Sequence, residues 1–286
     1  MHMYTLDKQQ HSVKEPEMPP AAAQTNYASV NGLNMYYEIH GAGRPLVLLH
    51  GAYMTIPSAW GKLLPTLAET RQVIAVELQG HGRTADIDRP LGYEQMADDT
   101  AALLREIGVE NADIFGYSMG GGAALQLAIR HPHLVRNLVV ASATYKSEGI
   151  YPEVLAMIET ITHDVFAGSP WEAEYLRLAP NPHDFPTLVA KLTQLDGEIQ
   201  DWPAEDIRKI RAPTLIIIGD SDVVRPEHAV ELFRLLGGGV VGDLGGLPNA
   251  RLAVLPGTSH IGVMEQTELL LAIIPPFLDA PLPEGA

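Results

Sequence analysis

The stretch Phe115-Gly116-Tyr117-Ser118-Met119-Gly120-Gly121-Gly122 decides the fold of this chain. An apolar, strand-like run precedes it and a helix-like run follows it, so Gly-x-Ser-x-Gly stands at a turn from a strand into a helix. Glycine suits positions 116 and 120 because a side chain there would collide with neighbouring backbone. A helix that begins just after Ser118 also directs its N–H groups and its positive dipole end to the place where an oxyanion would form. This context favours a nucleophilic serine over the alternative, a glycine-rich turn with a solvent-facing serine.

The length and composition are those of a globular protein. With 286 residues the chain fits one large domain, or a domain with an insertion, and can bury a sizeable core. The formal net charge of −16 argues against nucleic acid or an anionic membrane as a partner. It favours neutral or cationic small molecules only slightly, because a global charge says little about one pocket. The absence of cysteine excludes disulfides, thiolate zinc sites and cysteine nucleophiles.

The N-terminal residues 1–24 are predicted to form a flexible extension, because they are polar and rich in proline. They lack the apolar core of a signal peptide, and no later run is long enough to span a membrane. We therefore expect a cytoplasmic protein with no membrane partner. The sequence leaves a homo-oligomer open without indicating one.

Short apolar runs alternate with helical patterns along most of the chain. Continuous apolar runs are typical of strands that are covered on both faces, and Asn31-Gly32 predicts a hairpin turn. The predicted strands lie at residues 27–40 (a hairpin), 44–51, 72–78, 112–115, 138–142, 214–218 and 251–255, with helices at 60–70, 93–107, 123–129 and 265–278. This alternation predicts an α/β fold with a mostly parallel, doubly wound sheet.

The alternation stops between residues 145 and 208, where four helix-like pieces follow one another without a strand. A parallel crossover needs only about a dozen residues, so we interpret this segment as a helical cap over the carboxyl edge of the sheet. The predicted domains are a core of residues 25–144 and 209–286 and a cap of residues 145–208. Residues Gly237–Gly246 form a second glycine-rich segment, which lacks a phosphate-binding lysine and is expected to be a flexible excursion.

The nucleophile needs a base, and the base needs an orienting acid. Of the 11 histidines, His260 directly follows an apolar strand, and the ends of parallel strands face one crevice. Asp220 and Asp222 leave another strand at the same edge. We choose Asp222, since the residue just off a strand more often braces the turn while the later one can reach across. The order Ser118, Asp222, His260 is the one expected of this topology.

Five segments in this order make the chain resemble the α/β-hydrolase superfamily, in its capped, esterase- and lipase-like branch, over roughly residues 27–280. The segments are His50-Gly51-Ala52-Tyr53, Gln79-Gly80-His81-Gly82-Arg83-Thr84, the stretch around Ser118, Gly219-Asp220-Ser221-Asp222 with Pro226, and Gly257-Thr258-Ser259-His260. The resemblance implies that the backbone N–H groups of Ala52 and Met119 hold the oxyanion, and it supports Asp222 over Asp220. Glu77 and Thr84 stand where the family usually has Asp and Ser, in a structural turn away from the chemistry.

These residues predict a serine hydrolase that cleaves a small-molecule carboxylic ester through an acyl-enzyme, without a cofactor. The histidines show no metal-binding spacing such as His-Glu-x-x-His, so no metal site is expected. Tyr53 and Tyr145 are the candidates for substrate contact, because each directly follows a strand at the catalytic edge.

Two classes of alternative remain open, because one fold supports many chemistries. Within enzymes, the same triad serves hydrolysis of a lactone or a C–C bond, or perhydrolysis. From a different class, the chain could be a ligand-binding member of the fold without catalysis. A serine nucleophile disfavours haloalkane dehalogenases and epoxide hydrolases, which resemble this scaffold but use Asp.

Overall fold

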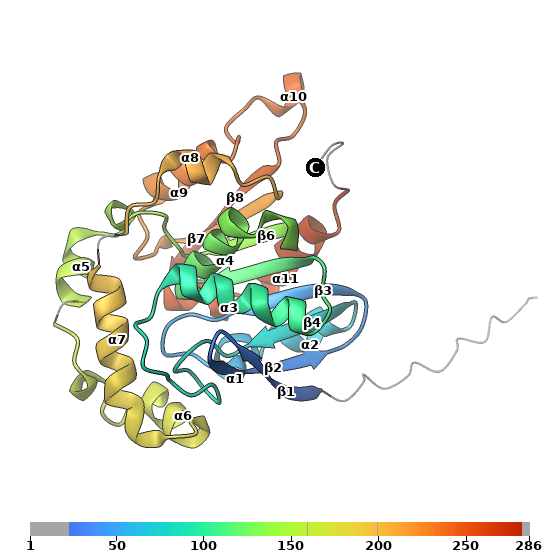
Figure 1. Cartoon of the computed structure of the whole chain (residues 1–286). Helices are drawn as coiled ribbons and strands as arrows, with labels where there is room; N and C mark the ends of the chain where they lie inside the picture. Colours follow the sequence, from blue (N-terminus) through green and yellow to red (C-terminus); the bar gives the residue numbers. More distant parts are fainter. Residues whose placement is uncertain (1–22, 159, 199, 282–286) are drawn as a thin grey trace, which may run out of the picture.

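A mostly parallel sheet forms the centre of the computed structural model, which describes residues 23–281 except residues 159 and 199 (Figure 1). Over this range the sheet has eight strands in the order β1-β2-β4-β3-β5-β6-β7-β8. β1 pairs antiparallel with β2 and β2 pairs antiparallel with β4, whereas β3 to β8 run parallel. The strands are β1 (Gln24–Val30), β2 (Leu33–His40), β3 (Arg44–Leu49), β4 (Arg71–Val76), β5 (Ala112–Tyr117), β6 (Val135–Ala141), β7 (Thr214–Ser221) and β8 (Ala250–Ser259). The predicted fold class is confirmed.

Helices cover both faces of the sheet, because successive strand residues point to opposite sides. Val47 and Leu49 of β3 belong to one apolar core and Leu46 and Leu48 to the other. The first core includes residues of α3 (Tyr93–Glu106), α4 (Met119–Arg130), α8 (Ala204–Arg208) and α9 (Pro226–Leu235), and the second includes residues of α1 (Ile56–Trp60), α2 (Leu64–Ala68) and α11 (Thr267–Leu278). This double cover explains why the strands read as continuous apolar runs.

The single helix predicted at residues 60–70 is wrong, because α1 and α2 are separated by a turn. Pro65 lies in the first turn of α2. Its ring would clash with the carbonyl group of Gly61 in a continuous helix, and it has no N–H to donate. A proline is accommodated at the start of a helix, so a new helix begins there.

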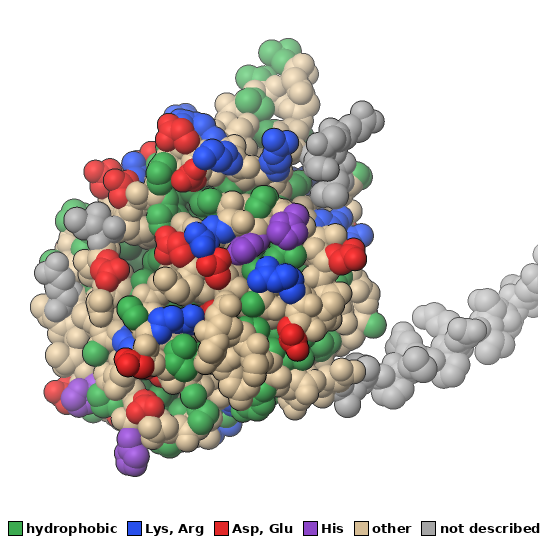
Figure 2. All heavy atoms as spheres, in the orientation of Figure 1, with side chains coloured by type: hydrophobic (Ala, Val, Ile, Leu, Met, Phe, Trp, Pro, Cys, Tyr) green, Lys and Arg blue, Asp and Glu red, His purple; other side chains and the backbone are tan. Residues whose placement is uncertain are grey.

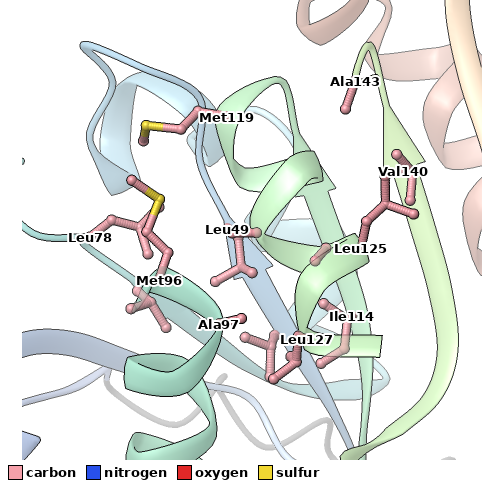
Figure 3. Close-up of a cluster of buried hydrophobic side chains, with 14 of the residues drawn as sticks. Leu49, Leu78, Met96, Ala97, Ile114, Met119, Leu125, Leu127, Val140 and Ala143 are labelled. Atoms are coloured by element: carbon pink, nitrogen blue, oxygen red, sulfur yellow. The ribbon is translucent and has the colours of Figure 1, made fainter. Parts of the chain in front are cut away.

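The helix α4 is anchored to the sheet by a closely packed apolar cluster. Figure 3 shows Leu125 and Leu127 of α4 together with Leu49, Ile114 and Val140 of the sheet. Met96 and Ala97 of α3 lie in the same cluster. This packing holds the N-terminal end of α4, where Ser118 stands, against the ends of β3 and β5.

The helices between β6 and β7 form what we call the inserted segment, residues 145–208. Its elements are η2 (Ser147–Gly149), α5 (Pro152–Ile158), η3 (His163–Phe166), α6 (Pro170–Leu178), η4 (Pro182–Asp184), α7 (Phe185–Gly197) and α8, and α5, α6 and α7 lie along one side of the molecule (Figure 1). Lys191 of α7 donates to the Asp86 carboxylate (2.6 Å) and to the carbonyl oxygens of Ile87 and Arg89, which fastens α7 to the loop after β4. The proposed division into a core and a separate cap domain stays a prediction.

The sequence also predicts a flexible N-terminal extension and a flexible glycine-rich segment at Gly237–Gly246. Residues 1–22 of the predicted extension lie outside the described residues, and Gln24 already begins β1. The glycine-rich segment contains the short helix α10 (Gly242–Gly245), in which Leu244 is exposed, as is Leu247 just after it. Figure 2 shows hydrophobic side chains at the projecting end of this excursion. Across the described ranges, none of the helices has the length and apolar character needed to cross a membrane.

Replacement of Gly120 by Ala tests the contact between α4 and the sheet. An added Cβ would lie 2.0 Å from the carbonyl oxygen of Leu49 and 2.6 Å from that of His50. We expect Gly120→Ala to lower the free energy of unfolding by roughly 1–3 kcal/mol, the usual cost of overpacking a core. Urea denaturation measures this change.

The matched control is Gly197→Ala at the end of α7. An added Cβ there meets no atom within 4 Å, so this variant should gain up to about 1 kcal/mol from helix propensity. Equal stability of the two variants would contradict the close contact at Gly120.

Candidate active site

Ser118 stands in a strained turn between β5 and α4. Its backbone has φ 52° and ψ −120°, a conformation that L side chains rarely adopt. A Cβ at Gly116 would lie 2.2 Å from the carbonyl oxygen of Gly120, and one at Gly120 would meet Leu49. The N–H of Ser118 donates to the carbonyl oxygen of Ala141 in β6 (2.8 Å). The glycines therefore allow the close backbone approach that holds the serine in this conformation.

The structure brings the three predicted catalytic side chains together. The Ser118 hydroxyl lies 2.9 Å from Nε2 of His260. On the other side of the imidazole, Nδ1 of His260 lies 2.7 Å from Oδ1 of Asp222. Nδ1–H therefore donates to the carboxylate, which leaves Nε2 as the acceptor for the serine hydroxyl. This arrangement is that of a nucleophile, a base and an orienting acid.

The Asp222 carboxylate is buried and fully engaged. Ser142 Oγ donates to its Oδ2 (2.6 Å), as does the N–H of Gly219 (3.3 Å), and the N–H of Val224 donates to its Oδ1 (3.2 Å). Burial alone would raise the pKa of Asp222, but the hydrogen bond and charge of His260, with the donors Ser142 and Val224, hold the pKa below its usual value. Asp222 is therefore an anion at neutral pH and fixes the tautomer of His260.

The neighbouring carboxylate of Asp220 has a different place. It is exposed and accepts the N–H groups of Gly257 (2.8 Å) and Thr258 (3.1 Å). These hydrogen bonds lower the pKa of Asp220. Asp220 braces the end of β8, whereas Asp222 is the carboxylate that contacts His260.

Ala52 and Met119, the two predicted oxyanion residues, lie at the same site. Both residues line the cavity that contains Ser118, and a Cβ on Gly51 would lie only 3.3 Å from Cβ of Ser118. In the described part of the chain, neither amide has a hydrogen-bond partner. Two unsatisfied donors beside a nucleophile can hold a developing oxyanion.

Two buried histidines shape the loop that carries Ala52. His50 donates from Nδ1 to the carbonyl oxygen of Gly51 (2.8 Å) and accepts the N–H of Leu78 (3.1 Å). His81 accepts the N–H of Tyr53 (3.2 Å) at Nε2. Burial lowers the pKa of His50 to about 3 and that of His81 to about 4. Both are neutral braces of the loop.

Ser118 and His260 open onto a cavity of about 320 Å³, which is within the usual range of small-molecule sites. The inserted segment supplies much of its apolar lining: Ile150, Val154, Met157, Ile158, Ile161, Phe166, Trp171 and Leu195. Within the described residues, no group of three or more His, Asp or Glu side chains is placed to hold a metal ion. The site is therefore an apolar cavity with the reactive serine in its wall.

The two tyrosines predicted to touch substrate have different positions. Tyr53 lines the cavity, and its ring centroid lies 4.5 Å from that of Phe166. The expectation for Tyr145 is corrected, because this residue is buried outside the cavity. Its ring stacks on His228 of α9, and its hydroxyl donates to Glu231 (2.5 Å). The chain turns after β6 so that Ala143 and Thr144 face the cavity and Tyr145 packs against α9.

Sequence reasoning missed two residues of the site, Ser142 and Asp196. Ser142 follows β6 directly, with φ 53°, so the rule that strand ends gather at one edge could have found it. Asp196 lies on α7 and lines the cavity. No motif marks it, because its approach to Ser118 depends on how the inserted segment packs.

Comparisons of the sequence and of the structure with known proteins both find hydrolases. The model of the Alpha/beta hydrolase family matches residues 46–273. The 2-hydroxy-6-oxo-2,4-heptadienoate hydrolase of Pseudomonas putida is 31% identical over 222 residues, which cover 68% of this chain and 79% of that protein.

Two solved structures share the fold at lower sequence identity. A meta-cleavage product hydrolase from Pseudomonas fluorescens has a TM-score of 0.72 at 21% identity, covering 90% of this chain and 97% of that one. An enol-lactonase from Burkholderia xenovorans has a TM-score of 0.68 at 21% identity, covering 89% and 100%. At this identity the likeness shows the fold and not the substrate.

The neutral state of His50 and His81 has a measurable consequence for stability. In the unfolded chain each imidazole protonates near pH 6.5, whereas the folded protein keeps both neutral down to pH 5. The unfolded state then binds more protons, so stability falls as pH falls. Lowering the pH from 7 to 5 should cost about 2 kcal/mol for each histidine.

Proton NMR checks the same point directly. The ring signals of His50 and His81, assigned by comparison with the single His→Gln variants, should stay constant between pH 5 and 8. A titration midpoint near pH 6.5 for either ring would contradict a buried, neutral brace.

Proposed function

The chain belongs to the alpha/beta hydrolase family, and from this premise we propose that it hydrolyses carboxylic esters with Ser118 as the nucleophile. One observation carries the proposal. An unbroken chain of hydrogen bonds runs from Asp222 through His260 to Ser118. The serine opens into a cavity that Ala52 and Met119 also line, and their amides have no hydrogen-bond partner among the described residues. That arrangement meets the requirements of acyl transfer, which are an activated nucleophile and a place for the oxyanion.

The proposed reaction has two steps, acylation of Ser118 and hydrolysis of the acyl-enzyme. His260 takes the proton as Ser118 Oγ attacks the ester carbonyl carbon, and the N–H groups of Ala52 and Met119 receive the oxyanion. The protonated His260, stabilised by Asp222, then gives its proton to the departing alkoxide, and the acyl group stays on Ser118. Water attacks this acyl-enzyme with His260 again as base, and the acid is released.

The charge of the cavity supports neutral or cationic esters over carboxylate substrates. Asp196 and Glu198 line the cavity, and within the described residues no Lys or Arg does. The name of the Pseudomonas putida relative describes a dienoate, which is a carboxylate. A carboxylate in this cavity would meet like charge without a compensating cation. This observation argues against C–C cleavage of that substrate class here.

Lactone hydrolysis is the second candidate, because a lactone is a cyclic ester and requires the same steps at Ser118. A ligand-binding role without catalysis is disfavoured, since binding alone would not require the three side chains to be aligned. Perhydrolysis has no supporting feature among the described residues.

Ser118→Ala tests the proposed nucleophile. Wild-type protein should hydrolyse short-chain p-nitrophenyl esters, and the variant should lose activity by more than about 10³-fold, because removal of a triad member eliminates the acyl-enzyme route. Release of p-nitrophenol measures the rate.

A fluorophosphonate probe provides a second readout of the same residue. Mass spectrometry should find the label on Ser118 in the wild-type protein. If the wild type shows no hydrolysis above the Ser118→Ala background and the probe leaves Ser118 unlabelled, the esterase proposal is wrong.

Asp222→Asn and Asp220→Asn form a matched pair that tests the acid. Asp222→Asn should lower kcat by roughly 10³–10⁴-fold, because an amide at this position favours the wrong tautomer of His260. Asp220→Asn keeps an acceptor for the exposed turn and should lose less than about tenfold. A larger loss in Asp220→Asn would overturn the assignment.

A further inference from the structure

The inserted segment brings two carboxylates to the cavity that holds Ser118, and that of Asp196 is the less exposed, since Glu198 lies at the surface. Asp196 lies near the end of α7, directly after the buried Leu195, and both line the cavity. Among the described residues, neither a hydrogen bond nor an ion pair involves this carboxylate. Burial raises the pKa of Asp196 to about 6, and the charge of His260 only partly opposes this effect.

The position of the Asp196 carboxylate lowers the stability of the folded protein when no ligand is bound. A negative charge in the last turn of a helix opposes the helix dipole, whose negative end lies there. Partial burial of a carboxylate without a partner adds a desolvation cost. The described structure shows no contact that offsets these costs, whereas a cation bound in the cavity would do so.

The rest of the cavity wall is suited to such a cation. Aromatic side chains from the core and the inserted segment line it: Tyr53, Tyr93, Tyr117, Phe166 and Trp171. Asp196 lines the same cavity as Tyr53 and Tyr93. Burial raises the pKa of both tyrosines, and the charge of Asp196 adds to both shifts. Aromatic rings with a carboxylate are the groups that recognise alkylammonium ions.

We propose that Asp196 and the aromatic wall form a subsite for an alkylammonium group, so that the enzyme prefers esters carrying a cationic nitrogen. The proposal deepens the ester hydrolysis proposed above and rests on it for turnover. The subsite and the site of attack share one wall, because Tyr53 follows Ala52 directly and both line the cavity. One substrate can therefore present its carbonyl to Ser118 and its cation to Asp196.

Binding to an inactive protein tests the subsite without turnover. The probe is butyltrimethylammonium, titrated by calorimetry into Ser118→Ala at pH 8, where Asp196 is ionised. Adding Asp196→Asn should weaken binding about tenfold, because the quaternary ammonium then loses its Coulomb attraction to the carboxylate. Adding Asp243→Asn, which removes one exposed negative charge from α10, should change the affinity less than twofold.

A pair of isosteric esters tests the preference in the active enzyme. These are 2-(trimethylammonio)ethyl acetate and its neutral analogue 3,3-dimethylbutyl acetate, with a second pair that carries the same groups on the acyl side. For at least one pair, the ratio of kcat/KM for the cationic ester to that for the neutral ester should fall about tenfold in Asp196→Asn. It should stay within twofold of wild type in Asp243→Asn.

The outcomes separate the two proposals. If Ser118-dependent hydrolysis occurs but neither the ratio nor the binding depends on Asp196, the subsite is wrong and the esterase proposal stands. If butyltrimethylammonium binding depends on Asp196 but no ester is hydrolysed, the esterase proposal is wrong and the cation site stands. Absence of binding to Ser118→Ala overturns the subsite.

Discussion

The close approach of α4 to the ends of β3 and β5 is the constraint on which the site depends. The backbone at Gly120 lies so near the carbonyl groups of Leu49 and His50 that no side chain fits. This contact, together with that between Gly116 and Gly120, holds Ser118 at positive φ. The packing of α3 and α4 on the sheet supplies the stability that maintains the strained serine.

The other groups of the site reach Ser118 because parallel strands end at one edge. Asp222 follows β7, His260 follows β8, and Ala52 lies in the loop after β3. Each is held by polar contacts of its own, such as the Ser142 hydroxyl on Asp222 and the neutral His50 beneath the Ala52 loop. The sheet thus sets the positions of the strand ends, and buried hydrogen bonds set the orientation of each group.

The cavity above this edge is shaped by the inserted segment, whose apolar and aromatic side chains enclose the serine. Lys191 fastens α7 to the loop after β4, and α7 carries Asp196 into the cavity. A change in this segment can therefore alter which substrate is accepted without moving Ser118 or His260. This separation suits a family whose members share the fold and differ in substrate.

The sequence by itself determined the fold class and placed Ser118, Asp222 and His260 at one edge, and its resemblance to the α/β hydrolases added Ala52 and Met119. Strand ends and the turn around Ser118 are local patterns, and one topology rule brings them together. Only the tertiary structure decided that Tyr145 packs on His228 while Asp196 faces the site. These positions depend on how the chain turns after β6 and how α7 packs, and packing between distant segments leaves no periodic signal in the sequence.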